Sequence, residues 1–335
     1  MFINIIIIFY NMFFKYFIML NLLLFSFLSL FISDLMILWF FLEINNFLFI
    51  SFTQIQMKNK KMIFLYFIIQ IIASFMMIFS IIMNNFFFFN NYLSLLFLIS
   101  LLFKLGIPPF HSWLPMITPF LSWDILFIML TIQKLTPFYM ISLMKMNIFM
   151  FYMVLIMCCI IPPYMSLNKN NFKLIMAYSS INQSGWMILL IYLKIFLWFN
   201  YFIFYSLISF SLFWFINYFK MNMNFKYTFL MNNFKLNMIP LMLLLNMSGM
   251  PPFSFFIMKW YSIYFSLYNS NFFLILIMMM LSSLFMLYIY INMTLYSMFI
   301  YKYTSKFIIM IMNTSEYLML FVFISLFISQ ILLII

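Results

Sequence analysis

Runs of about 20 consecutive apolar residues recur from one end of this chain to the other, and each could cross a bilayer as a helix. Apolar residues make up 69% of the 335 residues, and charged residues make up only 6%. A water-soluble domain cannot bury so much apolar surface, so lipid must form part of the solvent. We therefore expect an all-α polytopic membrane protein without a soluble domain.

Polar clusters divide the chain into eleven predicted transmembrane helices. The predicted spans are 14–33, 35–54, 62–83, 91–113, 122–142, 147–166, 172–192, 196–219, 237–268, 271–293 and 317–335. We expect residues 1–335 to form a single transmembrane domain, and the odd number of spans places its two ends on opposite sides.

The lysines between these spans fall mainly on one side of the membrane. The side that holds the amino terminus carries Lys58, Lys60, Lys61, Lys169, Lys173, Lys220, Lys226, Lys235, Lys302 and Lys306. The opposite side carries only Lys145 and Lys194, which is the asymmetry of the positive-inside rule. Lys15 lies near a span end and can snorkel. Because the lysines are scattered between spans, the net charge of +12 does not indicate nucleic-acid binding.

Four charged residues fall inside the apolar runs. A lysine at mid-bilayer costs about 2.5–3.5 kcal/mol, so Lys104, Lys134 and Lys259 each require a partner or a hydrated cavity. Snorkelling cannot account for Lys134, which lies deep within its predicted span. Glu43 also lies in mid-span, and we expect its carboxylate to pair with Lys104.

Other polar residues have structural interpretations. Asp34, Asp124 and Glu316 lie where predicted helices begin, so capping and the helix dipole explain them. Cys158 and Cys159 lie in an apolar run without histidine or acidic neighbours, so we expect them to be buried small hydrophobic residues.

Two near-identical strings, KLGIPPFHSW at Gly106 and MSGMPPFSFF at Gly249, predict matching helix breaks. A proline pair removes backbone donors, and a membrane helix tolerates this only where protein or water satisfies the freed carbonyls. The breaks fall in spans four and nine, and this odd offset indicates an inverted-topology repeat. We expect approximate repeats over 14–142 and 147–293, followed by a terminal helix over 317–335.

His111 and the polar string around Gly185 can each be interpreted in two ways. His111 either makes a structural hydrogen bond or relays protons beside Lys104, because histidine titrates near neutrality. The string KLIMAYSSINQSGWM around Gly185 either bonds neighbouring helices together or lines a hydrated proton path.

Five strings together resemble the antiporter-like membrane subunits of respiratory complex I, over about residues 35–265. The strings are FLEIN, KLGIPPFHSWLP, TIQKLTPF, KLIMAYSSINQSGWM and SGMPPFSFFIMKW. By this resemblance, Glu43 and Lys104 form the ion pair where charge enters, Lys134 is the central carrier and Lys259 is the far site of proton translocation. The family often has a histidine at the position of Gln183, which puts a titrating relay there in doubt.

The resemblance also implies a parent complex that couples electron transfer from NADH to ubiquinone with proton translocation, using FMN and iron–sulfur clusters. This chain has no cysteine cluster and no Gly-rich phosphate loop, so we expect it to bind no cofactor or metal. We expect subunits 4 and 4L of the membrane arm, together with membrane lipids, to be its partners.

Composition indicates the compartment. Phe (53) and Met (37) are abundant whereas Gly falls to 3, which is typical of an AT-rich animal mitochondrial gene. We therefore expect the mitochondrial inner membrane, with the amino terminus in the matrix and the carboxyl terminus in the intermembrane space. A stand-alone cation/proton antiporter and a purely structural membrane subunit are the alternatives.

Overall fold

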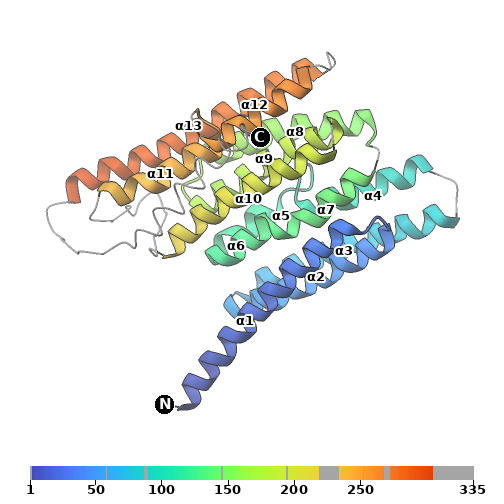
Figure 1. Cartoon of the computed structure of the whole chain (residues 1–335), viewed down its shortest axis with the longest axis horizontal. Coiled ribbons are helices and arrows are strands. Elements are labelled where there is room, and N and C mark those ends of the chain that lie inside the picture. The colour runs from blue at the N-terminus through green and yellow to red at the C-terminus, as the bar shows by residue number, and fades with distance from the viewer. Residues whose placement is uncertain are drawn as a thin grey trace. The chain divides into compact units, whose positions relative to one another are not determined.

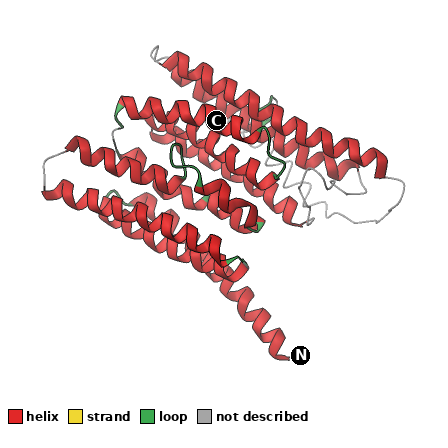
Figure 2. Ribbon diagram, turned by 180° about the vertical axis from the view of Figure 1, so that it is seen from behind, coloured by secondary structure: helices red, strands yellow, loops and turns green. Residues whose placement is uncertain are grey.

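Helices form every regular element that the structure describes, as predicted (Figure 2). This computed structural model describes residues 2–57, 59–86, 90–144, 146–193, 195–218, 234–251, 253–267 and 272–304. Helices are required because lipid offers no hydrogen-bond partners, so each span must satisfy its own backbone groups.

The first of two compact units spans Met1–Phe151. Its elements are α1 (Phe2–Leu28), η1 (Ser29–Phe31), α2 (Leu35–Gln56), α3 (Lys60–Phe86), α4 (Asn90–Leu105), α5 (Trp113–Ile117), η2 (Thr118–Phe120), α6 (Trp123–Leu130) and α7 (Ile132–Leu143) (Figure 1). α7 is the central helix of this unit, because it packs against α1, α2 and α4.

The second unit spans Tyr152–Ile335. Its elements are α8 (Ile148–Ser166, which begins in the first unit), α9 (Phe172–Leu193), α10 (Ile195–Tyr218), α11 (Phe234–Ser248), α12 (Ser254–Leu267) and α13 (Phe273–Thr304). α9 packs against α10, α12 and α13. Every residue of α9 from Ile175 to Ile191 is buried, so its polar side chains face protein and not lipid.

Eight segments within the described residues are long and apolar enough to cross a membrane, and all coincide with predicted spans to within a few residues. They are Phe13–Phe31, Leu35–Gln56, Lys60–Asn84, Trp123–Leu143, Ile148–Ser166, Phe172–Leu193, Phe196–Tyr218 and Phe273–Met293. The predicted spans 91–113 and 237–268 are absent from this set because breaks divide them into shorter helices. The span 317–335 lies outside the described residues, so the count of eleven stays a prediction.

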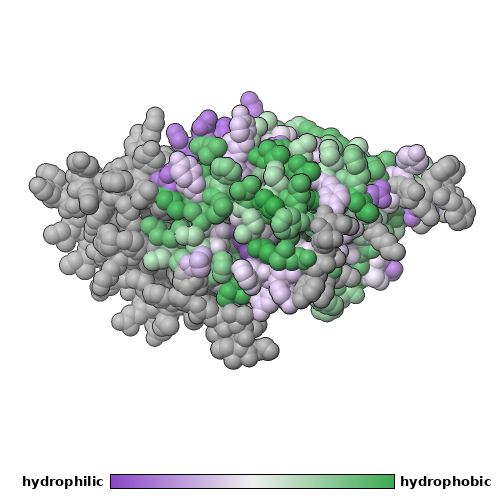
Figure 3. All heavy atoms as spheres, turned by 90° about the horizontal axis from the view of Figure 1, so that it is seen from above, coloured by the Kyte–Doolittle hydropathy of each residue, from purple (hydrophilic) through white to green (hydrophobic). Residues whose placement is uncertain are grey.

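The outer faces of these helices are apolar. Phe31 is 86% exposed and Phe196 is 83% exposed. On the face shown in Figure 3, hydrophobic side chains cover the middle and hydrophilic side chains lie mainly towards the edges. Such a surface suits lipid tails or apolar partner helices.

The two glycine breaks share one backbone geometry. In each break, the glycine amide donates to the carbonyl three residues before it, and the following amide donates to the carbonyl five residues before it. The distances are 3.3 and 3.1 Å at Gly106 and 2.9 and 3.2 Å at Gly249, where φ is +65° and +79°. This is a Schellman helix ending, for which glycine is favoured. The inverted relation between the two units stays a prediction.

Candidate proton-transfer site

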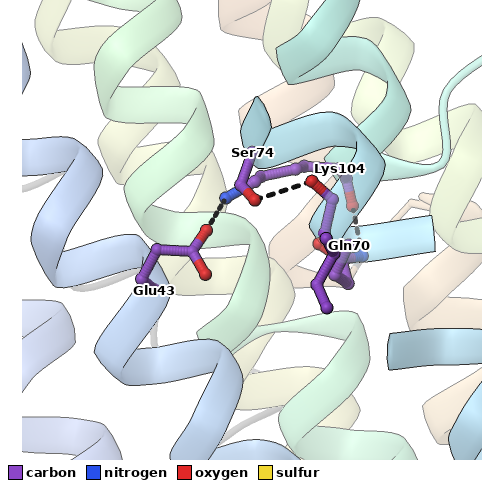
Figure 4. A network of polar contacts seen from close by, with 5 residues as sticks. Glu43, Gln70, Ser74 and Lys104 are labelled. Carbon is purple, nitrogen blue, oxygen red and sulfur yellow. Dashed lines mark hydrogen bonds and ion pairs between the residues drawn. The ribbon is translucent and has the colours of Figure 1, made fainter. Parts of the chain in front are cut away.

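Glu43 on α2 and Lys104 on α4 form the predicted ion pair, with Lys104 Nζ 3.3 Å from Glu43 Oε1 (Figure 4). The lysine side chain is 2% exposed and the glutamate side chain 17%. Gln70 on α3 donates to the Lys104 carbonyl at 3.5 Å, and Ser74 belongs to the same polar network in Figure 4. A carboxylate on α2 thus balances the charge of a buried amine on α4, and α3 holds the backbone of that lysine.

Lys134 lies on α7 and is 3% exposed, so its amine faces protein and not lipid, as predicted. The helix is interrupted just before it at Thr131, where φ is −120° and ψ is −80°. Pro137 within α7 cannot donate a backbone hydrogen bond. No glycine or proline marks the interruption at Thr131 in the sequence.

A cavity of about 10 Å³ is lined by both Lys104 and Lys134. Asn46, Gln70 and Gln133 supply amide groups to its wall, and Nδ2 of Asn46 is buried without a hydrogen-bond partner in the described part of the chain. A space of this size holds about one water molecule. The first unit therefore places two buried lysines around one small cavity that has amide groups in its wall.

Lys259 lies on α12, just after the second break, and is 5% exposed. Its Nζ donates to the Ser248 carbonyl at 2.6 Å and lies 5.6 Å from the centre of the Phe255 ring. A Cβ at Gly249 would come within 2.8 Å of Lys259 Cδ. The glycine therefore provides both the turn and the space for the lysine stem.

His111 lies in the loop between α4 and α5. Its Nδ1 atom is buried without a hydrogen-bond partner among the described residues. The ring does not line the cavity that holds Lys104 and Lys134. Its role in a relay stays a prediction.

Two peripheral charges have a partner that the sequence did not predict. Lys15 and Asp124 form an ion pair of 2.8 Å. Asp124 lies in the first turn of α6, at a helix start as predicted. α1 packs beside α7, and this brings Lys15 to the first turn of α6. Asp34 occupies the N-cap position of α2 without a side-chain capping bond. Glu316 lies outside the described residues.

Three buried tyrosines on α10 and α13 were not predicted as site residues: Tyr201, Tyr205 and Tyr290. Tyr201 donates its hydroxyl proton to Gln183 Oε1, and Gln183 Nε2 donates to the Met247 carbonyl at 3.2 Å. Tyrosines one turn apart share a helix face, so the spacing of Tyr201 and Tyr205 was the available signal. Cys158 and Cys159 are buried, as predicted.

Comparison with known proteins defines the class of this membrane protein. A family model described as "NADH:quinone oxidoreductase/Mrp antiporter, TM" matches residues 32–286. The NADH-ubiquinone oxidoreductase chain 2 of Anopheles gambiae is 34% identical, over 79% of this chain and 80% of that protein. The chain therefore belongs to the NADH:quinone oxidoreductase/Mrp antiporter membrane family, and its resemblance to the subunit 2 branch is confirmed.

Solved structures show the same fold. A chain of respiratory complex I from Thermus thermophilus with bound aureothin has a TM-score of 0.80 at 16% identity, covering 96% of this chain and 79% of that one. A chain of the Mrp complex from Dietzia sp. DQ12-45-1b has a TM-score of 0.69 at 15% identity, covering 88% of this chain and 61% of that one. At such identities the likeness extends to the fold alone.

Proposed function

We propose that proton translocation by this chain runs over Glu43, Lys104, Lys134 and Lys259. The chain is a proton-translocating membrane subunit of respiratory complex I, and it is not itself a redox centre. It spans the mitochondrial inner membrane several times, within a membrane arm that contains other subunits.

The observation that carries this proposal is that Lys104, which is buried and paired with Glu43, lines one small cavity together with the buried Lys134. Burial disfavours a charged amine, whereas a nearby carboxylate favours it, so a lysine held between these effects can gain or lose a proton. Neighbouring ammonium groups repel, so a proton that reaches one amine favours release from the next. Charge can therefore move between amines without a bound substrate.

The finer assignments are part of the same proposal. FMN, the iron–sulfur clusters and the sites for NADH and ubiquinone belong to other subunits, and subunits 4 and 4L are neighbours of this chain. The amino terminus lies in the matrix and the carboxyl terminus in the intermembrane space, and the lysine asymmetry of the loops supports this part of the proposal.

Lys134→Met tests the central carrier, because methionine keeps the stem volume and removes the titrating amine. We expect the complex to assemble and proton release per NADH oxidised to collapse in reconstituted vesicles. Lys169→Met, at an exposed lysine between α8 and α9, is the matched control and should pump normally. Normal proton release in the Lys134→Met complex would refute the carrier role.

A stand-alone cation/proton antiporter is the second candidate, because the family and the fold include a chain of an Mrp complex. The 34% identity to a complex I subunit favours the first candidate. Purification in mild detergent separates the two. Co-migration with flavoprotein subunits supports complex I, and isolation without them supports the antiporter.

A further inference from the structure

The second unit contains a group of buried hydroxyls that the lysine pathway does not include. Tyr201, Tyr205 and Tyr290 are 0%, 1% and 1% exposed. Their phenol groups lie close enough to interact electrostatically, Tyr201 with Tyr205 and Tyr205 with Tyr290. They form a row of three hydroxyls beside the polar segment of α9.

Two of these hydroxyls have no hydrogen-bond partner of good geometry among the residues that the structure describes. The hydroxyls of Tyr205 and Tyr290 face Ser180 and Ser179 of α9, but neither forms a hydrogen bond of normal geometry. A buried polar group without a partner costs about 1–3 kcal/mol, and lipid cannot supply one. Phenylalanine would fill the same space without this cost, and the chain uses Phe 53 times against 22 for Tyr. The hydroxyls therefore require a role or a hydrating water.

The row begins beside Lys259. Tyr201 packs its ring against Phe255 with a centroid distance of 4.8 Å, and the Lys259 amine lies over the same Phe255 ring. The side chain of Gln183 accepts a hydrogen bond from the Tyr201 hydroxyl and donates one to the carbonyl of Met247. The next carbonyl along, that of Ser248, accepts from Lys259. One amide side chain thus fixes Tyr201 next to the lysine.

The row then leads away from mid-membrane. Gln183 lies near the middle of α9, and the serines that face Tyr205 and Tyr290 lie about one turn closer to its amino-terminal end. The direction is therefore from Lys259 towards the loop that precedes Phe172. From Ile175 to Gln183, every α9 side chain is buried in protein.

We infer that Tyr201, Tyr205 and Tyr290 form a hydrated hydroxyl relay that connects Lys259 with the membrane face at the amino-terminal end of α9. Each hydroxyl oxygen gains a proton from the group before it and gives its own proton to the group after it. Every hydroxyl is therefore neutral again at the end, and one proton has moved along the row. Gln183 is a positioning residue that orients the first hydroxyl. This inference rests on the proposed role of Lys259 as a proton carrier.

The test compares tyrosine and lysine variants of the intact complex. We expect Tyr205→Phe/Tyr290→Phe to assemble with little change in thermal stability, because neither hydroxyl forms a hydrogen bond of good geometry with the described residues. Proton release per NADH oxidised should fall to the level of the Lys259→Met complex. Tyr288→Phe is the matched control, because Tyr288 lies on the same helix and is 55% exposed.

The outcomes separate the relay from the proposed function. If Lys259→Met abolishes proton release while the tyrosine double variant pumps normally, the relay is refuted and the lysine pathway stands. Lower thermal stability with normal coupling would make the tyrosines structural and would also refute the relay. Normal pumping by the Lys259→Met complex would overturn the carrier role of Lys259, and the relay with it.

Discussion

Glu43 and Lys104 are an unequal pair, because the lysine side chain is almost fully buried whereas the glutamate side chain keeps 17% of its surface exposed. The buried amine therefore depends on the carboxylate more than the carboxylate depends on the amine. Removing one member of a buried pair leaves a single uncompensated charge, which is more costly than removing both.

Glu43→Gln should therefore destabilise the assembled complex by about 3–5 kcal/mol or force Lys104 to remain neutral. Either result should slow proton release, since the amine loses the partner that favours its charged form. Glu43→Gln/Lys104→Met should assemble better than the single variant, although it should not pump. Thermal unfolding and proton release of the reconstituted complexes measure both effects. Normal pumping by Glu43→Gln would contradict the assignment.

At the scale of the helices, α7 and α9 differ in the source of their buried polar groups. α7 is interrupted at Thr131 and carries Pro137, which has no backbone donor, so its regular hydrogen-bond ladder is broken close to Lys134. α9 is continuous, and its polarity comes from serine and amide side chains. Gly185 permits this burial, because a Cβ there would come within 2.9 Å of Cys158 Cβ.

Gly249→Ala tests the coupling of the second break to its lysine. An alanine in the left-handed region costs about 1–2 kcal/mol, and its Cβ would also displace the Lys259 stem. Shortening that stem with Lys259→Ala removes the clash, so Gly249→Ala/Lys259→Ala should lose less stability than the sum of the two single changes. A double-variant cycle by thermal unfolding measures this coupling, and strictly additive losses would show that the glycine serves the turn alone.

At the scale of the whole molecule, orientation in the membrane can be tested at the two ends of α8. Asn147 and Lys169 are exposed and lie before and after this helix, whereas Cys158 and Cys159 are buried and should give little background. A membrane-impermeant maleimide should label Lys169→Cys from the matrix side and Asn147→Cys from the intermembrane side. Mitoplasts and inverted inner-membrane vesicles provide the two sides. Labelling in the opposite sense would reverse the predicted topology.

The sequence alone determined eight of the eleven predicted spans, the two glycine breaks and the Glu43–Lys104 pair. These features follow from local rules: the length of apolar runs, the missing donors of proline pairs and the cost of an isolated charge in lipid. Eight predicted spans coincide with helices, and Glu43 and Lys104 form the ion pair that was predicted.

Only the tertiary structure decided which faces of these helices are buried. Helices that are apolar all round carry no periodic stripe to show which side meets protein and which meets lipid. The Lys15–Asp124 pair, the cavity shared by Lys104 and Lys134, and the tyrosine row beside α9 all join helices that are distant in sequence. Such contacts depend on how helices pack, and the composition of each span leaves that choice open.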